Sequence, residues 1–167
     1  MTLIGIAGAA RSGKDTLAKA LQHALKGAEL MSFAWAVKQR ADPICREKYG
    51  ISAFTEDSEH KKVIRPTLID IGHGERQKYP DVWVNIIHKR IEVELPEKNI
   101  IVTDIRYKNE SEMVRANGGT VIFVQREGQA DIPTEKESLP GVVWDVKLDI
   151  GRFNLPDFLK LLIPGFR

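Results

Sequence analysis

The stretch TLIGIAGAARSGKDT, residues 2–16, contains the features that decide the fold. Thr2 to Ala7 is a short apolar run that ends in glycine, which predicts a buried β-strand. Apolar residues then recur at helical spacing from Leu17 to Leu25, and Gly27 stops that pattern. A strand that passes through a glycine-rich turn into a helix can surround phosphate oxygens with backbone N–H groups. The sequence therefore predicts a phosphate-binding turn between residues 8 and 14.

The turn fits the pattern G-x-x-x-x-G-K, with Gly8, Gly13 and Lys14 at the fixed positions. Its glycines let the backbone bend inward, and the helix N-terminus adds a positive dipole. The alternative is a glycine-rich turn that carries an exposed lysine and binds nothing. We expect the turn to hold ATP through these residues: Gly8, Arg11, Ser12, Gly13, Lys14, Asp15 and Thr16.

The residue after the lysine departs from the common pattern, which has Ser or Thr there to bind Mg²⁺. Asp15 occupies that position and Thr16 follows. Two arrangements remain open: Asp15 binds the metal through a water molecule, or Thr16 supplies the hydroxyl.

Length and composition limit the class of protein to which the chain can belong. The 167 residues suit one domain, and 43% hydrophobic with 29% charged residues is ordinary for a globular protein. A net charge of +2 does not indicate a nucleic-acid partner. Cys45 is the only cysteine, so we expect a reducing, cytoplasmic setting. The apolar run Leu3 to Ala10 is too short for a bilayer and follows no basic segment, so neither a membrane span nor a secretory signal is expected.

Alternation of apolar runs and amphipathic segments predicts an α/β fold with a mainly parallel sheet. Further strands are expected at Glu29–Phe33, Ile100–Thr103, Thr120–Val124 and Trp144–Ile150. Helices are expected at Trp35–Tyr49, Asn109–Ala116 and Leu155–Leu162, and residues 53–95 look mainly helical with breaks near Gly72–Gly74 and Pro80. Trp35 and Trp144 are expected in the core. Residues 125–142 predict a long, lid-like loop.

Asp104 and Arg106 follow the strand predicted at Ile100–Thr103. Ligands of open α/β sheets bind at the carboxyl ends of the strands, so Asp104 should face the same crevice as the phosphate-binding turn. A carboxylate and a guanidinium at this place could orient Mg²⁺ or a substrate phosphate. A structural Asp–Arg ion pair is the alternative.

Residues 8–16, together with Thr103-Asp104-Ile105-Arg106-Tyr107-Lys108-Asn109-Glu110, resemble the phage-type deoxynucleoside monophosphate kinases. Segments at 32–38, 65–72 and 80–85 match as well, and the resemblance covers most of residues 1–124. It implies a P-loop kinase fold, a three-layer αβα sandwich around a mainly parallel five-stranded sheet. It also implies ATP-dependent, Mg²⁺-assisted phosphorylation of a deoxynucleoside 5′-monophosphate to the diphosphate.

The resemblance also implies roles for residues of the acceptor site. A helical region at about 35–95 would bind the acceptor, with Lys38 and Arg65 on its phosphate and Trp83 beside its base or sugar. The family's glycine at Gly72 is present, but His73 replaces the hydroxyl residue that commonly follows it. The acceptor site would be completed by Asp104, Arg106 and Glu110. Trp83 lies between two valines and could equally be a core residue.

Phosphoryl transfer needs cations around two phosphate groups more than it needs covalent chemistry. We expect Lys14, Asp104 and Arg106 to be the catalytic residues and Arg126, at the start of the 125–142 loop, to act from a lid. The partner is then a small nucleotide, and the sequence leaves open whether the chain forms a homodimer.

Three alternatives remain open. One is a nucleotide-binding switch or regulatory ATPase with no small acceptor. Another is a kinase of another acceptor such as dephospho-coenzyme A, which Ser32-Phe33-Ala34 after the second strand disfavours. The third is a degenerate relative that retains only the fold.

Overall fold

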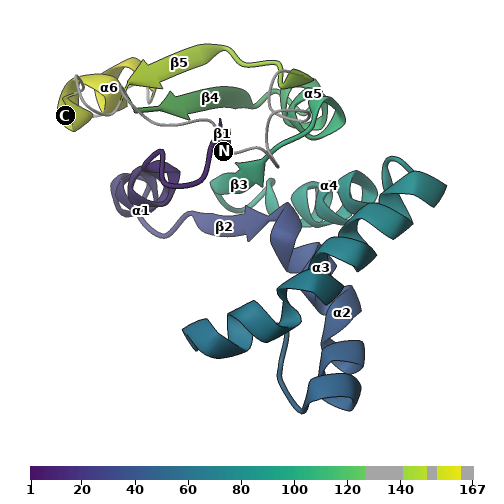
Figure 1. Ribbon diagram of the computed structural model, residues 1–167. Helices are drawn as coiled ribbons and strands as arrows, with labels where there is room; N and C mark the ends of the chain where they lie inside the picture. Colours follow the sequence, from purple (N-terminus) through teal and green to yellow (C-terminus); the bar gives the residue numbers. More distant parts are fainter. Residues whose placement is uncertain (127–140, 150–153, 163–167) are drawn as a thin grey trace. The chain divides into compact units, whose positions relative to one another are not determined.

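The computed structural model describes residues 1–126, 141–149 and 154–162 (Figure 1). The chain divides into two compact units. Unit 1 comprises Met1–Met31 and Ile91–Arg167, and unit 2 comprises Ser32–Arg90. Residues 127–140, which make up most of the segment expected to be a lid, lie outside the described residues.

A five-stranded parallel sheet forms the centre of unit 1 (Figure 1). Its strands are β1 (Leu3–Gly8), β2 (Glu29–Ser32), β3 (Ile100–Ile105), β4 (Thr120–Gln125) and β5 (Val146–Asp149), in the order β2-β3-β1-β4-β5. The predicted fold class is therefore confirmed. The strand bounds differ from the predicted ones by a few residues, and Gln125 ends β4 rather than beginning the loop.

Helices cover both faces of this sheet. The core residues Ile4 and Ile6 of β1 pack in one cluster with α1 (Lys14–Ala24) and α6 (Leu155–Leu162). Gly5, between them, faces the opposite way, where α5 (Lys108–Ala116) packs: a Cβ on Gly5 would lie 3.2 Å from a methyl group of Val114. This alternation is the period of two that a strand imposes, and it gives the three layers that the sequence predicted.

The order of the strands favours a ligand site at the carboxyl ends of β1 and β3. β1 and β3 are neighbours, so their carboxyl ends lie side by side. The helix that follows β1 covers one face of the sheet, and the helix that follows β3 covers the other. When the connections after two neighbouring strands run to opposite faces of the sheet, they diverge at the strand ends, and a ligand can bind between them.

Unit 2 is helical. It contains α2 (Phe33–Tyr49), α3 (Ser58–Lys78) and the first nine residues of α4 (Val82–Glu94). Its small core includes Ala41, Cys45, Ala53 and Ile64. Burial raises the pKa of the Cys45 thiol, as expected of an inert buried cysteine.

The break predicted near Gly72–Gly74 is wrong, because α3 continues through both glycines. Glycine inside a helix costs about 1 kcal/mol relative to alanine, which packing can offset. Gly72 is buried, and its carbonyl oxygen accepts a hydrogen bond of 3.0 Å from Nε1 of Trp83. The break near Pro80 is confirmed, since α3 ends at Lys78 and α4 begins at Val82.

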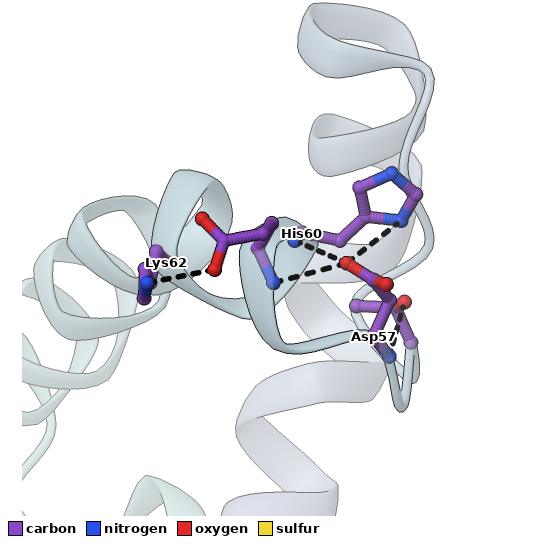
Figure 2. A network of polar contacts seen from close by, with 5 residues as sticks. Asp57, His60 and Lys62 are labelled. Carbon is purple, nitrogen blue, oxygen red and sulfur yellow. Dashed lines mark hydrogen bonds and ion pairs between the residues drawn. The ribbon is translucent and has the colours of Figure 1, made fainter.

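A polar network fixes the start of α3 (Figure 2). Oδ1 of Asp57 accepts hydrogen bonds from the backbone N–H groups of Glu59 and His60, at 3.0 and 2.8 Å. These bonds satisfy donors that a helix start leaves without partners. One turn further on, Lys62 bonds to Glu59 at 2.7 Å. The cap stabilises the first turn of α3, a helix of 21 residues that contains two glycines and Pro66.

The prediction that Trp144 lies in the core is wrong, since it is 46% exposed. The strand predicted at Trp144–Ile150 begins only at Val146, so Trp144 precedes the alternation that buries side chains. None of the helices among the described residues is long and apolar enough to cross a membrane.

Candidate active site

The turn between β1 and α1 has an unusual backbone. Gly8, Arg11 and Gly13 have φ values of 147, 63 and 96°. A Cβ on Gly8 would lie 2.4 Å from the carbonyl oxygen of Val124, so only glycine fits against the end of β4. The N–H of Ser12 bonds to the carbonyl of Ala9 at 3.2 Å and closes the bend. The segment is thus a tight loop that ends at a helix N-terminus, as the motif predicts.

Lys14 is the first residue of α1, and its side chain lies largely inside the protein with 7% of its surface exposed. Its Nζ donates a hydrogen bond of 3.3 Å to the carbonyl of Ala9 and lies 3.8 Å from Oδ1 of Asp104. A buried ammonium group needs such partners because burial removes its water. The lysine is therefore folded over the loop that it belongs to.

Asp104 reaches Lys14 because β3 contains an extra residue. Gly5 of β1 pairs with Val102, but Ala7, two residues on, pairs with Ile105, three residues on. Asp104 lies in this bulge and has φ of 60°, a left-handed conformation that Asp tolerates better than most residues. Oδ1 of Asp104 lies 3.8 Å from Nζ of Lys14, the residue that ends the turn, and a ligand crevice shared by the two stays a prediction.

Glu110 fixes the turn that follows β3. It is 2% exposed, and its Oε2 accepts hydrogen bonds from the backbone N–H groups of Arg106 and Tyr107, at 2.8 and 3.2 Å. Tyr107 is the N-cap of α5, and Glu110 is the third helical residue, so the glutamate supplies its half of a capping box by accepting the N–H of the N-cap residue. Arg106 is partly buried beside this turn.

The loop contains a group without a partner. Among the residues that the structure describes, the hydroxyl of Ser12 is the single buried side-chain polar group with no hydrogen bond. An unsatisfied buried hydroxyl costs about 1–3 kcal/mol, so a loop that carries one is suited to receiving a polar ligand. Together with the close approach at Gly8, this fits the loop to a phosphate chain.

Asp15 and Thr16 lie exposed in the first turn of α1. Across the described ranges, no three His, Cys, Asp or Glu side chains gather into a metal site. Mg²⁺ beside a nucleotide takes one or two protein oxygens and keeps water and phosphate as its other ligands. The exposed carboxylate and hydroxyl of these two residues fit that requirement.

In unit 2 the structure brings two of the expected acceptor residues together. Trp83 is 2% exposed and bonds through Nε1 to the carbonyl of Gly72. Lys38 lies over the ring of Phe54, with Nζ 5.9 Å from its centre. Arg65, on α3, is exposed. In unit 1, Arg11 and Arg126 are exposed as well.

Two features of the site were not expected from the sequence. The bulge at Asp104 leaves no mark in the sequence, because the usual sign of positive φ is glycine. The capping role of Glu110 has a signal, a glutamate three residues after a helix N-cap, but the N-cap here is Tyr107 instead of Ser or Thr.

A phosphate-binding loop between β1 and α1, with Lys14 and Asp104 meeting across the carboxyl ends of adjacent parallel strands, defines a P-loop kinase of small molecules. A family model described as phosphomevalonate kinase matches residues 6–120. The chain belongs to this family. It is accordingly an ATP-dependent kinase of a small-molecule acceptor.

Solved structures show the same fold at low sequence identity. A sugar kinase from Janibacter sp. HTCC2649, solved without ligand, is 13% identical, with TM-score 0.56 over 98% of this chain and 94% of that one. A candidate kinase from Chloroflexus aurantiacus is also 13% identical, with TM-score 0.55 over 96% and 92% of the two chains. A search of curated proteins finds no match to this chain.

Proposed function

We propose that the protein transfers the terminal phosphoryl group of ATP to a phosphate monoester, and that this acceptor is a deoxynucleoside 5′-monophosphate. The observation that carries the proposal is the meeting of Lys14 and Asp104, 3.8 Å apart, at the carboxyl ends of β1 and β3. The close match of residues 8–16 and 103–110 to the phage-type deoxynucleoside monophosphate kinases supports the choice of acceptor.

On the donor side, the N–H groups of the loop and the N-terminus of α1 bind the phosphate chain of ATP. Lys14 exchanges the Ala9 carbonyl for a phosphate oxygen and places its charge on the group being transferred. We assign Asp15 and Thr16 to Mg²⁺, which supplies charge neutralisation when it is bound with the nucleotide. Asp104 stays beside Lys14 and keeps the ammonium group oriented.

On the acceptor side, the chemistry requires cations, because donor and acceptor phosphates both carry negative charge and repel each other. We assign Arg106 to the acceptor phosphate, since it lies two residues after Asp104, in the turn that follows β3. Lys38 and Arg65 are assigned to the same phosphate, with Gly72 and Trp83 beside the rest of the acceptor. The exposed Arg126, directly after β4, is assigned to closing over the phosphates.

Phosphomevalonate is the second candidate acceptor, and the match of residues 6–120 to the phosphomevalonate kinase family favours it. It too is a phosphate monoester, so the same donor site and the same cations would serve. It has no base to stack. The indole of Trp83 is buried and bonded to Gly72, which agrees with such an acceptor.

The experiment is a coupled ADP-release assay with ATP, Mg²⁺ and a panel of acceptors. The panel contains the four deoxynucleoside monophosphates, their ribose counterparts, phosphomevalonate, and glucose as an unphosphorylated alcohol. We expect turnover with at least one deoxynucleoside monophosphate and none with glucose. Turnover with phosphomevalonate alone would replace the first candidate by the second, and turnover with glucose alone would contradict a phosphate acceptor.

A further inference from the structure

The end of β3 and the turn after it connect the residue that contacts Lys14 with the residue assigned to the acceptor phosphate. Asp104 lies in the bulge at φ 60° and contacts Lys14, and Arg106 follows two residues later. A left-handed residue within a strand is strained and persists only where its surroundings hold it. A group that holds the residues directly after Asp104 would support this conformation.

Glu110 is such a group. Its carboxylate is buried and accepts the N–H groups of two consecutive residues, Arg106 at 2.8 Å and Tyr107 at 3.2 Å. Hydrogen bonds to an ionised acceptor are stronger than those between neutral groups. The carboxylate also lies in the first turn of α5, where the helix dipole favours negative charge.

The first turn of α5 is fixed from a second side, so Glu110 acts from a rigid base. The neighbouring Ser111 is fully buried. Its Oγ donates to the carbonyl of Lys108 at 2.7 Å and accepts the N–H of Val143 at 3.0 Å. Because the carboxylate is held on this helical turn, its hydrogen bonds fix the position of the Arg106 and Tyr107 backbone.

We propose that Glu110 is the positioning residue of Arg106: it acts on the acceptor through the backbone of Arg106 instead of touching the acceptor itself. This inference rests on the proposed function, in which Arg106 binds the acceptor phosphate. Oε2 of Glu110 accepts both of the hydrogen bonds on which the inference rests, and both donors are backbone N–H groups. A displacement of about 1 Å in a positioning group can cost about 100-fold in rate.

The first test compares Glu110→Ala, Glu110→Gln and the control Glu112→Gln. Glu112 lies on the same helix, but it is exposed and paired with Lys108 at 3.6 Å. We expect Glu110→Ala to lower kcat/KM for the acceptor by about 10-fold to 100-fold. Glu110→Gln, whose amide oxygen still accepts a bond, should recover part of this loss, and Glu112→Gln should stay near wild type. Wild-type kcat/KM in Glu110→Ala would overturn the proposal.

The second test combines Glu110→Ala with Arg106→Ala. If Glu110 acts through Arg106, its removal in the Arg106→Ala background adds little, about twofold or less, because the group it positions is already gone. Losses that multiply in full would show that Glu110 acts on something else, and the proposal would then be wrong.

A readout without turnover separates this inference from the proposed function. In NMR spectra, the amide protons of Arg106 and Tyr107 should move upfield in Glu110→Gln, because a neutral amide is a weaker acceptor than a carboxylate. This measurement also serves if Glu110→Ala does not fold. Unchanged amide signals together with wild-type kinetics in Glu110→Gln would overturn the positioning role. A wild-type protein that is inactive on every acceptor would instead overturn the proposed function.

Discussion

The charge of Lys14 lies inside the protein with two partners, the carbonyl of Ala9 and the carboxylate of Asp104. Neither partner compensates it fully, since the distances are 3.3 and 3.8 Å. A nucleotide phosphate brings more negative charge than the Ala9 carbonyl and can displace it. The resting contact therefore leaves Lys14 poised at the place where the phosphate chain is expected.

Replacement of Lys14 by alanine should abolish most of the activity, by about 100-fold or more in kcat, because a charge aimed at the transferred group is lost. The far-UV CD spectrum should remain that of a folded protein. Lys19→Ala is the control, since Lys19 is an exposed lysine of the same helix. Full activity in Lys14→Ala would contradict a role of Lys14 and its loop in phosphoryl transfer.

Individual residues show which features of the site could be predicted from the sequence and which could not. The motif predicted Lys14 at the end of the loop, and the strand pattern predicted Asp104 at the same edge of the sheet. The left-handed backbone at Arg11 and Asp104 could not be predicted, because both are ordinary residues whose conformation is imposed by neighbours far along the chain. The carboxylate of Glu110, which the resemblance places at the acceptor, accepts hydrogen bonds from the backbone of Arg106 and Tyr107, and the sequence did not predict these contacts.

Among the helices, α3 shows why local signals can mislead. Two glycines within three residues usually mark a break, but here the helix continues through them. The N-cap at Asp57 stabilises the first turn (Figure 2), and Gly72 itself is buried close to Val37, where packing can offset the local preference of glycine. Patterns of apolar residues, by contrast, located every strand of unit 1 to within a few residues.

The continuity of α3 can be tested by replacing Gly74 with alanine, and Gly27, which lies outside this helix, serves as the comparison. A Cβ on Gly74 would meet nothing within 4 Å, so Gly74→Ala should stabilise the protein by about 0.5–1 kcal/mol, the cost of glycine within a helix. Gly27→Ala also has open space, but Gly27 has φ of 87°, so this change should destabilise. Urea unfolding measures both. Loss of stability in Gly74→Ala would contradict a continuous helix.

The connection between α2 and α3 makes stability depend on pH. Hydrogen bonds from Arg46 and Ser52, both 2.7 Å long, hold the pKa of Asp42 below its ordinary value of 3.8. A carboxyl whose pKa is lowered by folding stabilises the protein above its ordinary value, and the effect is lost as the pH falls through the lowered one.

We therefore expect the thermal midpoint of the wild type to exceed that of Asp42→Asn at pH 6, and the difference to shrink below pH 3.8. Glu47→Gln, an exposed change on the same helix, is the control and should alter neither value. A difference between wild type and Asp42→Asn that does not change with pH would show that the ionised carboxylate contributes nothing.

For the protein as a whole, the order of the strands explains the location of the candidate site better than any single residue does. Alternating strands and helices predicted a parallel sheet, and adjacency of β1 and β3 then places a loop and a carboxylate at one edge. The sequence predicted a helical region at about 35–95 within one domain, and unit 2 spans Ser32–Arg90, although the composition does not change at either boundary. The identity of the acceptor also cannot be predicted from the fold, since proteins of one fold act on many different acceptors.

The most direct test of the account is ³¹P NMR of a reaction that contains the protein, ATP, Mg²⁺ and a deoxynucleoside monophosphate. We predict that the monophosphate resonance is replaced by the two coupled doublets of a diphosphate, with an equal amount of ADP formed. Appearance of inorganic phosphate while the monophosphate signal stays unchanged would contradict the account, because it would describe an ATPase that transfers its phosphoryl group to water.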